Sequence, residues 1–217
     1  MKVCTDACVL GAFADVGVGG RLLDIGTGTA LLALMAAQRN PTVLIDAVEV
    51  DQNAVEQAKE NVADSPFAGR IRVVNERIQD FGGEKIYDRI LTNPPFYTNH
   101  LRSPDAAINR ALHTDELPFS ELLSAVLRLL KADGQWWVLL PSYETALLTE
   151  LTQGAGLTPF KRLALRHHNQ KPVFRVITGF SFSTGQLSEE TVSIYELDGR
   201  TYTDDFRVLL QDFYLIF

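Results

Sequence analysis

Residues 21–38 read Arg-Leu-Leu-Asp-Ile-Gly-Thr-Gly-Thr-Ala-Leu-Leu-Ala-Leu-Met-Ala-Ala-Gln. The first five are largely apolar, as in a buried strand, and residues 30–38 form a run of strong helix formers. Two glycines lie between these parts, so the segment predicts a strand, a tight turn and a helix. This succession is typical of the ligand-binding start of a doubly wound α/β sheet.

The rest of the chain continues the alternation of strands and helices. Further strands are predicted at 43–50, 71–75, 87–92 and 135–140, after a turn at 131–134. Helices are predicted at 5–14, 52–61 (capped by Asp51), 119–130 and 143–153. The last third predicts strands 161–166 and 174–183 around the loop 167–172, a weaker strand 192–197 and a helix 203–213. We therefore expect one α/β domain over residues 1–217, with a mostly parallel sheet and a C-terminal antiparallel hairpin.

The composition is that of an ordinary globular protein, with 46% hydrophobic and 22% charged residues among 217. No apolar run approaches the about 20 residues that a membrane span needs. The first residues include an acid and no apolar core segment, so we expect no secretory signal. Two cysteines, Cys4 and Cys8, are too few for a zinc site. These features predict reduced thiols, no metal, no membrane contact and a cytoplasmic location.

The charge distribution is uneven. The net charge is −7, yet no Asp or Glu occurs from Leu151 to Ser188. The basic residues of this segment are Lys161, Arg162, Arg166, Lys171 and Arg175. Such a segment can contact phosphates in a protein that is acidic elsewhere. The alternative is a strand pair whose basic side chains balance acids from other parts of the fold.

The segment Asn93-Pro94-Pro95-Phe96 follows the predicted strand 87–92 directly. Consecutive prolines cannot donate to a sheet, so the strand must end there with its backbone in a restricted shape. The carboxamide oxygen of Asn93 and the carbonyl of Pro94 are then two neutral acceptors beside an aromatic ring. This arrangement suits a planar group that carries an NH2. A proline-rich turn with a core phenylalanine is the alternative.

The glycine turn predicts a nucleoside site. Gly26, Thr27 and Gly28 let the backbone approach a ligand closely, and Glu49 is placed to meet a ribose diol. The third glycine of the dinucleotide pattern is replaced by Leu31, which argues against a pyrophosphate. S-adenosylmethionine has a ribose and no phosphate. We therefore expect it to bind through Asp24, Gly26–Gly28, Glu49, the adjoining Val50 and Asn93; a tight turn without a ligand is the alternative.

For the adenine of this cofactor, the turn after strand 71–75 is the expected wall. Ile78 could pack on the ring, while Gln79 or Asp80 could bond its amine. The alternative is that Ile78 and Phe81 are core residues and the polar side chains are solvated.

In the expected strand order, the glycine turn and Asn93 are neighbours. An exocyclic amine is a poor nucleophile because its lone pair is delocalised. Hydrogen bonds from its N–H groups to Asn93 and Pro94 would favour a pyramidal nitrogen that attacks the sulfonium methyl group in line. Phe96 would stack on the base. We expect methyl transfer without a metal or a strong base.

With these motifs together, the chain resembles the class I amino-methyltransferases, whose motif is (N/D)PP(Y/F). More narrowly, it is similar to the bacterial family that methylates the exocyclic amine of adenine 37 in valine tRNA. The similarity covers MKVCTDACVLGAF, LDIGTGTALLALMAAQR, AVEVD, LTNPPF, residues 110–113, KPVFRV and residues 212–215. The resemblance implies a Rossmann-like class I fold, S-adenosylmethionine as donor and tRNA as substrate.

The resemblance also bears on single residues. With tRNA as the implied substrate, we expect Arg166, Lys171 and Arg175 to contact its backbone, because the chain has few other basic clusters. Arg110 could reach a substrate phosphate, and a surface salt bridge is the alternative. The resemblance also implies a further N-terminal stretch before the MKV segment. Cys4 replaces a usual glycine, and Arg77 stands where an acid often faces the cofactor adenine. A monomer is expected.

Three other functions are compatible with parts of the pattern. A protein glutamine-amide methyltransferase would use Asn93 and Pro94 in the same way. A non-catalytic nucleoside- or RNA-binding module would keep the glycine turn. A nicotinamide oxidoreductase is disfavoured by Leu31.

Overall fold

The structure is a computed structural model that describes residues 4–94 and 117–217. The strands are β1 (Arg21–Ile25), β2 (Leu44–Glu49), β3 (Ile71–Asn75), β4 (Tyr87–Thr92), β5 (Leu130–Leu140), β6 (Thr158–Arg166), β7 (Val173–Ser181) and β8 (Ser188–Ser193). The α-helices are α1 (Thr5–Phe13), α2 (Leu31–Arg39), α3 (Gln52–Ala63), α5 (Phe119–Leu129), α6 (Ser142–Gly154) and α7 (Asp204–Leu210).

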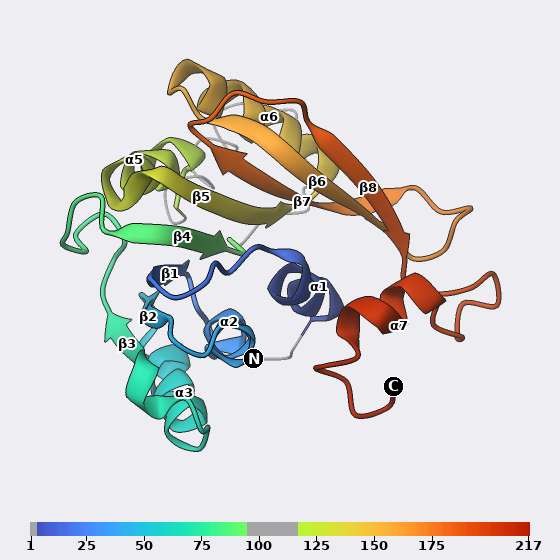
Figure 1. The fold of residues 1–217 in the computed structure, drawn as a ribbon, viewed down its shortest axis with the longest axis horizontal. Coiled ribbons are helices and arrows are strands. Elements are labelled where there is room, and N and C mark those ends of the chain that lie inside the picture. Colours follow the sequence, from blue (N-terminus) through green and yellow to red (C-terminus); the bar gives the residue numbers. More distant parts are fainter. Residues whose placement is uncertain (1–3, 95–116) are drawn as a thin grey trace, which may run out of the picture.

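All eight strands form one sheet, in the order β3-β2-β1-β4-β5-β7-β6-β8 (Figure 1). Strands β1 to β5 are parallel, and β7 is antiparallel to both β5 and β6. Because β6 therefore runs in the direction of β5, the carboxyl ends of β1, β4, β5 and β6 share one edge. We call it the active edge. The predicted mostly parallel sheet with a C-terminal antiparallel hairpin is confirmed.

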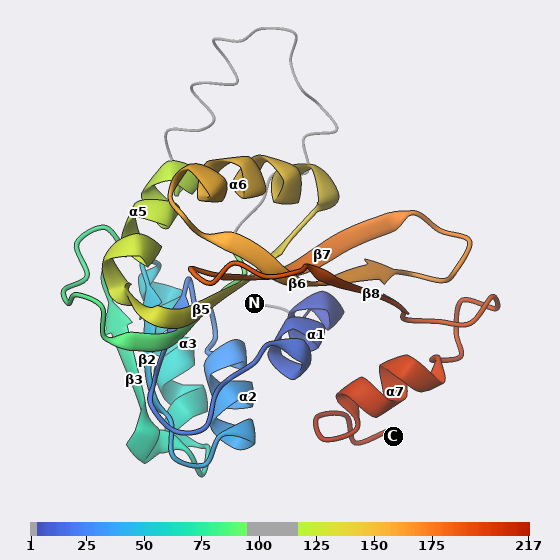
Figure 2. The same cartoon turned by 45° about the horizontal axis from the view of Figure 1, so that its top comes forward.

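Helices cover both faces of the sheet (Figures 1 and 2). One apolar cluster includes residues of α1, α2, α3 and α7 together with Trp137 of β5. The other joins α5 and α6 to Trp136 on the opposite face of the same strand. Both tryptophans are almost fully buried, so adjacent residues of β5 anchor the two cores.

Several local predictions are confirmed by the backbone. β1, β3 and β4 have the predicted bounds. Asp51 caps α3, accepting a hydrogen bond from the N–H of Ala54 at 2.8 Å. Cys4 and Cys8 form no disulfide bond within the described residues. None of the helices in the two described ranges is long and apolar enough to cross a membrane.

Two predictions near the chain's end were wrong in detail. The expected turn at 131–134 belongs to β5, where the pairing with β4 shifts register between Tyr87 and Arg89. The weak strand expected at 192–197 lies instead at Ser188–Ser193, where it pairs in parallel with β6. β8 is a mostly exposed edge strand held partly by ion pairs of Glu189 and Glu190, so apolar alternation could not locate it.

Candidate active site

The glycine turn connects β1 to α2 at the active edge. Gly26 and Gly28 have φ angles of 69° and 57°, in the left-handed region that favours glycine. The N–H groups of Gly26 and Thr27 both donate to the carbonyl of Val48, at 2.9 and 3.1 Å. A Cβ added to Gly26 would meet no described atom within 4 Å, so the backbone borders open space. The turn therefore offers the close backbone approach that the sequence predicts.

Ala30 lies at the N-cap of α2 with a φ angle of 68°. A left-handed alanine is sterically costly, and such conformations concentrate at functional sites. This conformation is not predictable from the residue type, because alanine normally favours the right-handed helix.

Glu49 at the end of β2 faces this turn. One carboxylate oxygen accepts the N–H of Gly28 at 2.9 Å. The other accepts the N–H groups of Val50 and Asp51, at 2.9 and 3.0 Å. The side chain is partly exposed, so three backbone donors fix a carboxylate whose remaining lone pairs are available to a ligand. Val50 itself is 65% exposed beside it.

Asp24 is fully buried beneath the turn. Its Oδ2 accepts hydrogen bonds from the Thr27 hydroxyl at 2.6 Å and from the Ala33 N–H at 3.2 Å. Its Oδ1 is buried and has no hydrogen-bond partner among the described residues. Burial raises the pKa of the carboxyl to about 7, with the charge of Glu49 adding to the effect and the two hydrogen bonds opposing it.

Asn93 and Pro94 follow β4 next to the glycine turn. β1 and β4 pair so that Ile25 lies opposite Thr92, which brings the two sites together as predicted. Asn93 is partly buried and Pro94 is buried. The end of β4 is fixed by the hydrogen bond from the Trp136 indole N–H to the Thr92 hydroxyl, at 3.1 Å. Pro95, Phe96 and Arg110 lie outside the described residues.

The turn after β3 lies one strand beyond Glu49, since the Glu76 N–H donates to the Glu49 carbonyl at 3.1 Å. Ile78 is 5% exposed and belongs to the apolar cluster that contains Ile25. Gln79 donates to Glu121 of α5 at 2.6 Å. The roles expected for Ile78 and Gln79 toward the cofactor stay predictions.

Arg128 of α5 holds this turn in place. Its guanidinium donates to the carbonyls of Phe81 and Ile78, at 2.6 and 3.0 Å. The role of Arg128 was not predicted, because the sequence of a helix does not indicate which backbone carbonyls, about 50 positions away, an arginine will bind.

The basic residues of β6 and β7 divide into two groups. Three are paired with acids from outside the acid-free segment: Lys161 with Glu190 at 3.1 Å, Arg162 with Glu189 at 3.4 Å and Arg175 with Asp6 at 3.1 Å. These three residues therefore fit the alternative in which the basic side chains of the strand pair balance acids from other parts of the fold. Arg166 and Lys171 lie at the hairpin end on the active edge, and Lys171 is exposed. The tRNA contacts expected for Arg166, Lys171 and Arg175 stay predictions.

Comparison with known proteins identifies the family. The methyltransferase small domain family matches residues 7–150. A tRNA1(Val) (adenine(37)-N6)-methyltransferase from Dyadobacter fermentans is 47% identical, covering 100% of this chain and 92% of its own. A relative of the same name from Pseudoalteromonas translucida is 39% identical, with 99% and 92% covered. The chain belongs to the tRNA1(Val) (adenine(37)-N6)-methyltransferase family.

Solved structures agree with this family's fold. A predicted O-methyltransferase from Agrobacterium tumefaciens superposes with a TM-score of 0.73 at 16% identity, over 95% of both chains. TrmN from Thermus thermophilus gives a TM-score of 0.60 at 24% identity, over 81% of this chain and 47% of that one. The class I methyltransferase fold expected from the resemblance is confirmed.

The site of this family member fits S-adenosylmethionine. The orphaned Oδ1 of Asp24 is suited to an ammonium group, the open backbone of Gly26 to an amino-acid end, and the fixed Glu49 carboxylate to ribose hydroxyls. No cluster of three or more metal-binding side chains occurs within residues 4–94 and 117–217.

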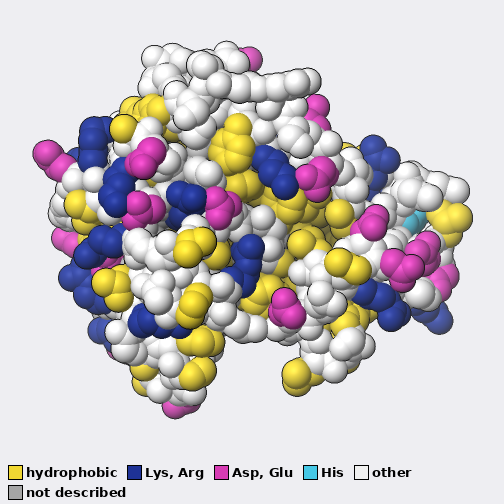
Figure 3. Space-filling view, in the orientation of Figure 1, with side chains coloured by type: hydrophobic (Ala, Val, Ile, Leu, Met, Phe, Trp, Pro, Cys, Tyr) yellow, Lys and Arg dark blue, Asp and Glu magenta, His cyan; other side chains and the backbone are white. Residues whose placement is uncertain are grey.

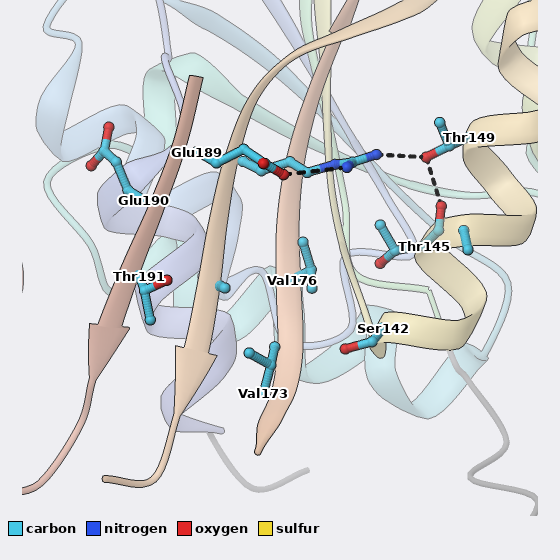
Figure 4. A pocket seen from close by; sticks show the side chains of 11 residues that line it. Ser142, Thr145, Thr149, Val173, Val176, Glu189, Glu190 and Thr191 are labelled. Carbon is cyan, nitrogen blue, oxygen red and sulfur yellow. Dashed lines mark hydrogen bonds and ion pairs between the residues drawn. The ribbon is translucent and has the colours of Figure 1, made fainter. Parts of the chain in front are cut away.

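A separate hollow of about 540 Å³ lies between α6 and strands β6 to β8 (Figure 4). Arg162 crosses it, with one guanidinium nitrogen on Glu189 and another on the Thr149 hydroxyl at 3.1 Å. The hollow contains neither the glycine turn nor Asn93. We therefore do not assign the chemistry to it.

Proposed function

We propose that this protein transfers a methyl group from S-adenosylmethionine to the exocyclic amine of adenine 37 in valine tRNA. The proposal is supported above all by the pairing of β1 with β4: Gly26–Gly28 follow the first of these strands, and Asn93 and Pro94 follow the second. The names of the relatives supply the tRNA and the target position.

Residues at the ends of different strands have different roles in the proposed reaction. Glu49 and the glycine turn bind the nucleoside and amino-acid parts of the cofactor, and the buried charge of Asp24 attracts its ammonium group from beneath the turn. When bound, the cofactor supplies an electrophilic methyl group on sulfur.

At the end of β4, the Asn93 side-chain oxygen and the Pro94 carbonyl accept the two N–H groups of the adenine amine. This contact orients the nitrogen lone pair toward the methyl group, and a proton leaves the product nitrogen for solvent. Catalysis thus rests on positioning and fixed dipoles.

The experiment offers the protein unmodified tRNA and, in a parallel reaction, a glutamine-containing protein substrate. Mass spectrometry of nucleosides from the treated tRNA should show N6-methyladenine. Methyl groups found only on protein glutamine would reject the proposal in favour of the related amide chemistry.

Asn93→Ala should lower the single-turnover rate at least about 100-fold, the usual cost of losing one oriented polar group. S-adenosylmethionine affinity, measured by calorimetry, should change little. The matched control is Asn53→Ala, on the exposed side of α3, which should keep the wild-type rate. Undiminished turnover by Asn93→Ala would contradict the mechanism.

A further inference from the structure

A stacked pair of rings stands at the end of the β6–β7 hairpin. The imidazole of His167 lies on the ring of Phe174, with centroids 4.3 Å apart and planes only 8° from parallel. His167 is exposed, whereas Phe174 is partly buried and packs on the cluster of α1 and α2. One ring is therefore anchored in the protein, and the other rests on it at the surface.

The backbone on either side of this pair is fixed. The carbonyl of His167 accepts the N–H of Tyr195 at 2.8 Å, and the carbonyl of Arg166 accepts that of Ile194 at 2.9 Å. The guanidinium of Arg175 lies 5.6 Å from the Phe174 ring centroid and bonds Asp6 of α1. The histidine plane is thus held in position before any partner arrives, which lowers the entropic cost of binding.

The surroundings match an RNA strand. His167 directly follows β6, whose end lies on the active edge with Asn93, three strands away in the sheet order β4-β5-β7-β6. At about 4.8 Å per strand this is about 14 Å across the sheet, and the strand register puts His167 four residues, or about 13 Å, further along the strand direction than Asn93. Lys171 lies exposed in the same hairpin, and residues 151–188 contain no acid, whereas Glu196, Asp204 and Asp205 line a hollow together with Asn169 on the side of the hairpin that faces the following segment. Figure 3 shows Asp and Glu side chains gathered beside the exposed histidine colour on the side of the molecule where β6 to β8 end.

We propose that His167 is a stacking platform for an unpaired base of the tRNA substrate, a few nucleotides from the target adenine. Unpaired RNA bases stack on histidine and other aromatic planes, and such contacts tolerate any base. Lys171 supplies charge for the neighbouring phosphate. This inference rests on the proposed function and adds a second base contact, which would hold the loop while the target base enters the site at Asn93.

The direct test uses tRNA transcripts that each carry 2-aminopurine at one unpaired position, scanned along the loop that contains the target adenine. Stacking quenches this fluorophore, so binding of the wild-type protein should lower its emission at one of the scanned positions. His167→Phe, which keeps an aromatic plane, should lower it similarly, and His167→Ala should not. Emission that stays unchanged in the wild-type complex at every scanned position would overturn the proposal.

Affinity gives a second readout. His167→Ala should weaken tRNA binding roughly 5- to 150-fold, the range for one stacked base. His167→Phe should stay within about threefold of wild type. The matched control is His168→Ala, which removes the neighbouring histidine, a residue whose imidazole accepts the Gln170 N–H.

The outcomes distinguish a packing role of His167 from a role in tRNA recognition. They also distinguish failure of the stacking proposal from failure of the proposed function. If His167→Ala lowers Tm but leaves tRNA affinity and 2-aminopurine emission as in wild type, the ring serves packing only and the platform is rejected. If N6-methyladenine forms normally in His167→Ala at wild-type KM, the platform also fails while the proposed function stands. Absence of tRNA methylation by the wild-type protein would instead reject the function.

Discussion

At the scale of single residues, the buried Asp24 carboxyl makes stability depend on pH. Its pKa is about 7 in the folded protein and 3.8 when unperturbed. The folded state therefore binds the proton more tightly than the unfolded state. Proton binding by Asp24 thus adds to the free energy of unfolding. This contribution is at most about 4 kcal/mol; it is fully present below about pH 4 and is lost as the pH rises through about 7.

The measurement is urea unfolding of the cofactor-free protein between pH 4.5 and 8. As the pH rises across this range, the free energy of unfolding of wild type should fall relative to that of Asp24→Asn. Parallel curves for the two proteins would contradict the buried titration.

Cofactor binding should have the opposite pH dependence. The ionised Asp24 attracts an ammonium group, so the affinity for S-adenosylmethionine should fall as pH drops below about 7, by up to tenfold per pH unit. Calorimetry at several pH values checks this. Asp24→Asn should bind weakly with little pH dependence in the same range.

Much of the site was predictable at this scale because its chemistry is local. The spacing of Asp24, Gly26, Gly28 and Glu49, and the acceptors of Asn93 and Pro94, are legible in short stretches of sequence. The pair of Arg175 with Asp6 joins residues 169 positions apart, and only the fold brings them together.

At the scale of elements, the packing around β7 is tight. A Cβ at Gly179 would lie 2.9 Å from ring atoms of both Phe160 and Trp137, which cannot easily move apart. Gly179→Ala should cost about 1–3 kcal/mol and lower Tm by about 2–12 °C, as measured by thermal unfolding. Gly185→Ala is the control, because its Cβ would meet no described atom within 4 Å. Equal Tm values for the two variants would contradict this reading of the core.

Strands and helices with apolar cores were the predictable elements. β1, β3 and β4 are set by short local patterns, and α5 by an apolar stripe. β8 was misplaced because its position is fixed by backbone pairing with β6 and by ion pairs to Lys161 and Arg162. Neither kind of interaction leaves a periodic signal in the sequence.

At the scale of the whole molecule, the proposed function requires a protein with a net charge of −7 to bind tRNA, which is itself a polyanion. Association should depend on a few exposed basic side chains and weaken with salt, since each phosphate contact releases counterions. Lys171→Gln should reduce the slope of log affinity against log salt by about 1. Filter binding at several salt concentrations measures the slope. Lys59→Gln, exposed on α3, is the control, and identical slopes for both variants would exclude Lys171 from the RNA contact.

The immobility of Glu49 has a consequence for cofactor choice. A carboxylate already held by the N–H groups of Gly28, Val50 and Asp51 cannot rotate to follow an altered sugar. A deoxyribose analogue would lack one of the hydroxyl donors of the diol, and the lost hydrogen bond could not be recovered by a new side-chain conformation. The enzyme should therefore discriminate sharply between ribo- and deoxyribo- forms of the same methyl donor.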